Sequence, residues 1–163
     1  MISKTLQDKI NEQIKNELYS AYLYLSMSAY FDGMNLPGFA HWMQVQSQEE
    51  ASHAMKFFNH LMERGARVVL QAIDQPPSEF KSVLDAFQQA LAHEQKVTAL
   101  INDLYALAIR ENDYPAQVEL QWFISEQVEE EKNAGDIVGT LKLIGEHGAS
   151  LIMLDRQLGA RAN

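Results

Sequence analysis

The chain has 163 residues, a usual size for a single domain, and its formal net charge at pH 7 is −9. It contains no cysteine, which excludes a disulfide framework and every metal site built on thiolates. The negative charge argues against nucleic acids and anionic membranes as partners and favours cations. The first residues show no apolar run typical of a signal peptide, and no stretch is apolar enough to span a bilayer. We therefore expect a cytoplasmic protein without membrane contact.

Helix-forming residues dominate the sequence between four clusters of glycine and proline. These segments are rich in Ala, Leu, Gln, Glu and Met. Ser3 can cap the first segment, while Pro37 and Pro115 suit the starts of the second and fourth. The pattern predicts one domain over residues 1–163, with helices at about 4–32, 38–64, 83–111, 115–145 and a short one at 149–158.

The links between these helices predict the topology. Short links join the first helix to the second and the third to the fourth, so each pair is antiparallel. The link between the second and third helices has about 17 residues and can reach roughly 55 Å when extended, whereas a 27-residue helix is about 40 Å long. The link can therefore cross the whole bundle. We predict an all-α four-helix bundle with one long crossover and a short fifth C-terminal helix.

Each long helix carries a carboxylate near the middle of its apolar face. The faces follow from alternating steps of three and four residues. In the second helix a glutamate and a histidine stand three residues apart, which puts both on this face. The polar residues on the four faces include Glu17, Gln46, Glu50 with His53, Glu94, and Glu130 with Gln127.

A single buried glutamate is usually a core group with a hydrogen-bond partner, but four at one level would repel one another. The apolar faces offer no lysine or arginine to neutralise them. One or two divalent cations would, and oxygen ligands with one imidazole suit iron or manganese better than a structural zinc site. The sequence therefore predicts a buried metal centre.

The whole chain resembles the bacterial non-haem ferritins, which have a ferritin-like di-iron four-helix bundle. The resemblance covers "LYSAYLYLSMSAYF", the "QEEASHAMKF" motif, the crossing link, "SEQVEEEK" and the short last helix. It implies that Glu17, Glu50 and His53 hold a first iron. It implies a second iron at Glu94 and Glu130, with Glu50 bridging the two.

The same resemblance assigns further roles. Gln127 would lie beside the iron pair and orient dioxygen or water, and Tyr24 would be a nearby redox-active tyrosine. Glu49, Glu126 and Glu129 would form a third iron site facing a cavity. The family builds hollow shells of twenty-four subunits, so a homo-oligomer of this size is expected.

The function implied is iron storage with ferroxidase activity, in which Fe(II) is oxidised by dioxygen or peroxide and kept as a ferric mineral. Bacterioferritins place a haem-ligating methionine directly after the site glutamate, where this chain has Ala51, so no haem is expected. Two alternatives remain open. One is an oxygen-activating di-iron enzyme with an organic substrate, and the other is a helical interaction module whose buried carboxylates stay protonated.

Overall fold

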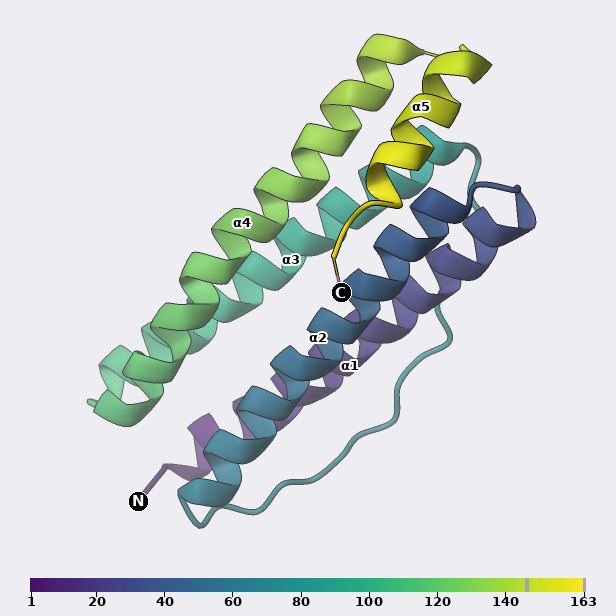
Figure 1. The fold of residues 1–163 in the computed structure, drawn as a ribbon. Helices are drawn as coiled ribbons and strands as arrows, with labels where there is room; N and C mark the ends of the chain where they lie inside the picture. The colour runs from purple at the N-terminus through teal and green to yellow at the C-terminus, as the bar shows by residue number, and fades with distance from the viewer. Residues whose placement is uncertain (146, 163) are drawn as a thin grey trace.

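The computed structural model describes residues 1–145 and 147–162, and within them it contains five α-helices and no strand (Figure 1). The helices are α1 (Lys4–Gly33), α2 (Pro37–Glu63), α3 (Val83–Arg110), α4 (Tyr114–Ile144) and α5 (Gly148–Leu158). No helix in these ranges has the length and hydropathy that a membrane span requires.

The four long helices form an elongated bundle (Figure 1). Helix α2 packs along α1, and α4 packs along α3, each as an antiparallel pair. The link over residues 64–82 runs along the outside of the bundle from one end to the other, which leaves α2 and α3 parallel. The predicted fold class, a bundle with one long crossover and a short fifth helix, is confirmed.

Local side-chain caps begin three of the long helices. The Oγ atoms of Ser3 and Ser82 accept backbone N–H groups three residues ahead, each at 3.0 Å. Asp113 does the same at the start of α4, and its two carboxylate oxygens also accept from Arg64 at 2.6 and 2.8 Å. Each cap satisfies a backbone donor that the first helical turn leaves free.

Helix α2 receives its cap from α5. Its own N-cap residue, Leu36, makes no side-chain cap, but Asp155 Oδ1 accepts the backbone N–H of Gly38 at 2.8 Å and of Phe39 at 3.0 Å. A Cβ atom on Gly38 would lie 1.6 Å from the carbonyl oxygen of Asp155, so this approach requires glycine. Helix α5 is therefore docked across the start of α2, with Leu154 buried beneath it.

The core consists of two apolar clusters separated by a polar layer. One cluster, near α5, includes Phe31, Phe39 and Phe87. The other lies towards the opposite end of the bundle, and in it the rings of Phe57 and Phe123 stack with centroids 3.9 Å apart. Between the two clusters each long helix also buries polar side chains, and these form the candidate site.

Candidate metal centre

The polar layer brings together one glutamate from each long helix and one histidine. Glu17 comes from α1, Glu50 and His53 from α2, Glu94 from α3 and Glu130 from α4. None of these side chains is more than 4% exposed, because the two apolar clusters enclose them from both ends of the bundle. The helical periodicity explains this placement, because each residue continues the apolar face of its helix.

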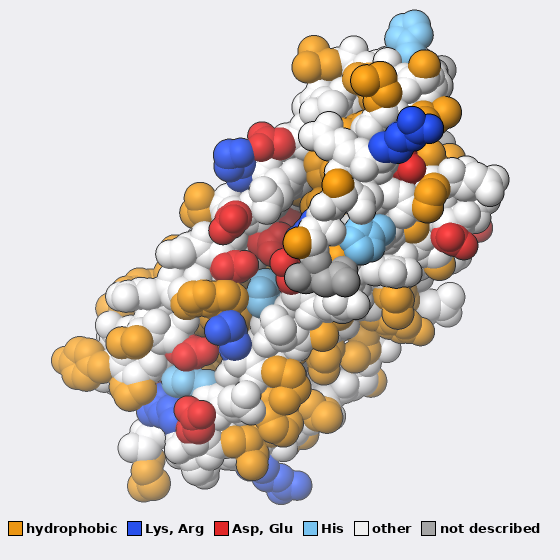
Figure 2. Space-filling view, viewed as in Figure 1, with side chains coloured by type: hydrophobic (Ala, Val, Ile, Leu, Met, Phe, Trp, Pro, Cys, Tyr) orange, Lys and Arg blue, Asp and Glu red, His pale blue; other side chains and the backbone are white. Residues whose placement is uncertain are grey.

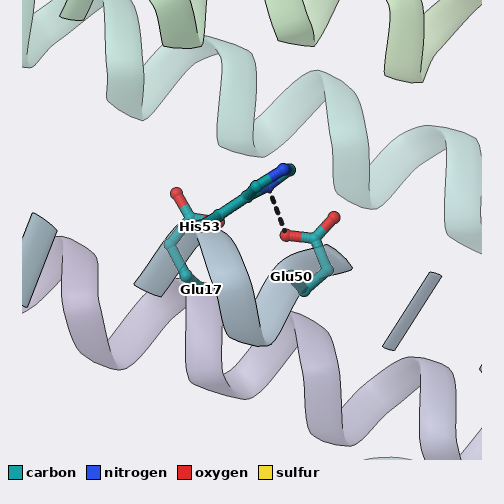
Figure 3. Close-up of side chains that lie close together, drawn as sticks. All are labelled: Glu17, Glu50 and His53. Carbon is teal, nitrogen blue, oxygen red and sulfur yellow. Dashed lines mark ion pairs between the residues drawn. The ribbon is translucent and has the colours of Figure 1, made fainter. Parts of the chain in front are cut away.

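The first group contains Glu17, Glu50 and His53, whose ligand atoms all lie within 4.8 Å of one another. Figure 3 shows the three side chains pointing towards one another from α1 and α2. His53 Nδ1 lies 3.4 Å from Glu50 Oε2. These two residues are three positions apart, so consecutive turns of α2 present them side by side.

The second group contains Glu50, Glu94 and Glu130, again with ligand atoms within 4.8 Å of one another. Glu50 belongs to both groups. The layer therefore offers two adjacent cation positions that share one carboxylate. The bridged metal pair that the family resemblance implies is compatible with this arrangement and stays a prediction.

Burial raises the pKa of the four carboxyl groups. For Glu17 and Glu50 the pKa lies well above the ordinary value, first because of burial and then because neighbouring glutamates repel the charged form. Burial also raises the pKa of Glu94. Burial and the charge of Glu94 raise the pKa of Glu130 to about 8. Cations in the layer would stabilise the charged forms that burial disfavours.

Two glutamine amides orient carboxylates of the layer. Gln13 Nε2 donates to Glu17 Oε1 at 2.7 Å. Gln46 Nε2 donates to Glu130 Oε2 at 2.5 Å and to Glu50 Oε1 at 3.5 Å. Both amides stabilise the charged carboxylates and hold their oxygens in fixed directions, as outer hydrogen-bond partners do around metal ligands.

Tyr24 and Gln127, which the family resemblance implies lie beside the pair, both contact Glu94. The Tyr24 hydroxyl donates to Glu94 Oε1, and Gln127 Nε2 donates to Glu94 Oε2 at 3.2 Å. Burial, followed by the charge of Glu94, raises the pKa of Tyr24 well above its usual range, so the phenol keeps its proton. Gln127 also donates to Thr98, whose hydroxyl donates to Glu131 at 2.6 Å.

The residues expected at a third site are only partly gathered. Glu126 forms a three-residue group with His53 and Glu130, and its Oε1 lies 3.9 Å from His53 Nε2. Within the described ranges, neither Glu49 nor Glu129 belongs to a group of this size. Figure 2 shows acidic and histidine side chains gathered between α4 and α2, on the face where this edge of the layer opens.

Two residues that contact the layer, and one at its edge, were not among the predicted site residues. Gln46 lies on the apolar face of α2, so its position in the pattern was a usable signal. Gln13 lies one turn before Glu17, which the i, i+4 spacing could have indicated. Arg161 follows the last helix, where no periodicity applies, yet its Nη2 lies 2.5 Å from Glu49 Oε2.

Comparisons with known proteins identify the family of this chain. The family model for the ferritin-like domain matches residues 7–144. A bacterial non-haem ferritin from Bacteroides fragilis is 42% identical over 161 residues, covering 99% of this chain and 100% of that protein. One from Campylobacter jejuni is 41% identical, covering 97% of this chain and 95% of the relative.

A solved structure has nearly the same fold. It is described as an open-pore ferritin from the hyperthermophilic archaeon Archaeoglobus fulgidus, and it matches with a TM-score of 0.99 and 49% identity. The match covers 99% of this chain and 100% of that one. The bundle with its single crossover, the carboxylate layer and these near full-length matches lead to one conclusion: the chain belongs to the ferritin family.

Proposed function

We propose that the protein stores iron and is a ferroxidase, with the buried carboxylate layer as the site of oxidation. The observation that carries this proposal is the sharing of Glu50 between two three-residue ligand groups. Two ions held side by side can deliver two electrons to one oxidant. The similar proteins are called ferritins, and they match this chain over nearly its full length, which supports the assignment.

The two Fe(II) ions are the substrates. Their oxidation to Fe(III) releases two electrons, which with two protons reduce dioxygen to hydrogen peroxide. If peroxide is the oxidant, the same electrons and protons reduce it to two water molecules. The protein contributes positioning and charge: Glu17, Glu50 and His53 bind one ion, and Glu50, Glu94 and Glu130 bind the other.

Residues around the pair have supporting roles in this proposal. Phe57 and Phe123 close one side of the layer with stacked rings, which keeps bulk water from that side. Gln127 directs its amide to Glu94 and is placed to orient dioxygen or water. The Tyr24 hydroxyl donates a hydrogen bond to Glu94 Oε1, and Tyr24 could supply an electron or a proton to the reaction. A surface pocket of about 270 Å³ between α1 and α3 includes Gln13, but none of the five proposed ligands lines it, so it gives an organic substrate no contact with the metals.

Storage requires a compartment and an exit from the paired site. We propose a cytoplasmic homo-oligomeric shell of twenty-four chains, as expected from the family. Glu49, Glu126 and Glu129 would bind a third ion on its way to the cavity. Electron micrographs after aerobic Fe(II) loading test the shell: hollow particles with dense cores support storage, and small oligomers without cores contradict it.

The paired site is tested by Glu94→Ala. Glu94 contacts only the second ion position, so the fast oxidation of about two Fe(II) per chain should be lost while the fold remains. Asp103→Ala is the matched control, because it removes an exposed carboxylate from the same helix. Stopped-flow absorbance during aerobic Fe(II) addition measures the fast phase. Wild-type initial rates in Glu94→Ala would contradict the second ion position.

The third site is tested by replacing Glu49, Glu126 and Glu129 with alanine together. The first oxidation of two Fe(II) ions should persist, because these residues lie outside the buried carboxylate layer. The ratio of Fe(II) to dioxygen consumed in later turnovers should change. Crystals soaked in Fe(II) should show a third metal peak only in the wild type. Two peaks per chain in wild-type crystals at saturation would exclude the third site.

A further inference from the structure

Arg161 is held beside the metal centre although it follows the last helix. After α5 the chain turns back and runs beside α2 towards the middle of the bundle (Figure 1). The carbonyl oxygen of Arg161 lies 2.9 Å from His41 Nε2, and its guanidinium group lies over the ring of Trp42, 4.7 Å from the centroid. The side chain is 21% exposed, so these contacts fix a mostly buried cation.

The guanidinium group reaches two residues of α2 at once. Nη1 donates to Gln46 Oε1 at 3.0 Å, and Nη2 donates to Glu49 Oε2 at 2.5 Å. A planar guanidinium can present two N–H groups in fixed directions, and it stays charged at every accessible pH. Arg161 therefore places a permanent positive charge beside the Glu49 carboxylate.

Gln46 transmits this contact to the carboxylate layer. An amide has one accepting end and one donating end. Because Oε1 accepts from Arg161, Nε2 is directed to Glu130 Oε2 at 2.5 Å. If the guanidinium left, the amide could rotate and place its oxygen against the carboxylate, which would be repulsive.

We propose that Arg161 is a positioning residue that competes with metal ions for Glu49 and so weakens cation binding at the third site. The inference rests on the proposed function, since it concerns ions leaving the oxidation site. A cation that uses Glu49 together with Glu126 competes with the guanidinium for the negative charge of the Glu49 carboxylate. The tethered charge therefore keeps the exit weaker than the paired site, and ions pass through it without being trapped.

The ion pair sets the size of the effect. The Glu49 side chain is 43% exposed, and pairs of this kind contribute up to about 1 kcal/mol, or roughly fivefold in affinity. Loss of the guanidinium should therefore lower the metal concentration that half-fills the third site by about threefold to fivefold.

The test uses Zn²⁺, which binds carboxylates and histidine without redox chemistry. Crystals of the wild type, Arg161→Ala and Arg161→Lys are soaked in a series of ZnCl₂ concentrations, and occupancies are refined against the anomalous signal. Arg156→Ala is the matched control, because Arg156 is an exposed arginine on α5. The third position should fill at a concentration about threefold to fivefold lower in Arg161→Ala. In Arg156→Ala it should fill at the wild-type concentration.

Arg161→Lys separates charge from geometry. A lysine keeps the positive charge but lacks the fork that contacts Gln46 and Glu49 together, so its half-filling concentration should lie between those of the wild type and Arg161→Ala. This comparison also decides the question if Arg161→Ala does not assemble. If the third position half-filled at the wild-type Zn²⁺ concentration in both variants, while the two positions in the carboxylate layer were filled, the inference alone would be overturned. If the two positions in the carboxylate layer stayed empty in the wild type, the proposed function would be overturned as well.

Discussion

Glu130→Gln should stabilise the metal-free protein at neutral pH. The side chain of Glu130 is 4% exposed, and its pKa is raised from 4.5 to about 8 by burial and by the charge of Glu94. Glutamine keeps the volume and still offers an oxygen to the Gln46 amide. The substitution therefore removes an unfavourable ionisation and leaves the packing in place.

The pKa gives the magnitude and its dependence on pH. Below pH 4.5 the carboxyl group is neutral in both states, so the variant and the wild type should be equally stable. As pH rises from 4.5 towards 8 the unfolded state loses its proton first, and the wild type loses up to about 1.4 kcal/mol per pH unit. The variant should be more stable by up to about 3 kcal/mol at pH 7 and about 5 kcal/mol above pH 8.

Guanidinium unfolding in EDTA at pH 5, 7 and 8.5, followed by circular dichroism, measures the difference. Glu129→Gln is the matched control, because it neutralises an exposed carboxylate on the same helix and should show no such pH dependence. Adding Zn²⁺ should reverse the order, since the wild type retains the ligand. A variant less stable than the wild type at pH 7 without metal would refute the reasoning.

Three further substitutions test the fold around the site. Asp155→Ala leaves the first two amides of α2 without an acceptor and should cost about 1 to 2 kcal/mol, with faster proteolysis at α5; unchanged proteolysis would contradict the docking. Burial alone would raise the pKa of Asp113, but hydrogen bonds from Arg64 lower it, so this pair adds stability above pH 3.8 that is lost as pH falls through the lowered pKa. Arg64→Ala should therefore shift acid unfolding to higher pH, and an unchanged midpoint would count against the pair. Phe57→Ala removes a ring stacked on Phe123 and should cost about 3 to 5 kcal/mol in guanidinium unfolding, whereas a loss below about 1 kcal/mol would show that the core collapses around the gap.

The bundle and the carboxylate layer could be predicted because both follow a local period. Apolar residues at steps of three and four fix which face of each helix is buried, and a glutamate on that face is buried with it. Ile144 shows where the period weakens: it continues the face of α4 but is only half-buried, because the bundle ends there. The crossing link was predictable from its length alone.

The contacts that complete the site could not be read from any period. Asp155 caps a helix 117 residues earlier in the chain, and Arg161 contacts Gln46 and Glu49 from a segment without regular structure. Such contacts depend on the path of the chain after α5, and that path is set by packing between distant segments. The apolar faces of the helices contain no lysine or arginine, so their pattern could not indicate that Arg161, which follows the last helix, reaches the edge of the carboxylate layer.

The cap that Asp155 provides has a consequence for synthesis on the ribosome. Helix α2 begins at Pro37, but the acceptor for its first amides lies 117 residues later. We therefore expect the opening turn of α2 to lack its cap while α3 and α4 are translated. Asp155 can cap that turn only after α5 has left the exit tunnel, so the start of the second helix waits for the fifth.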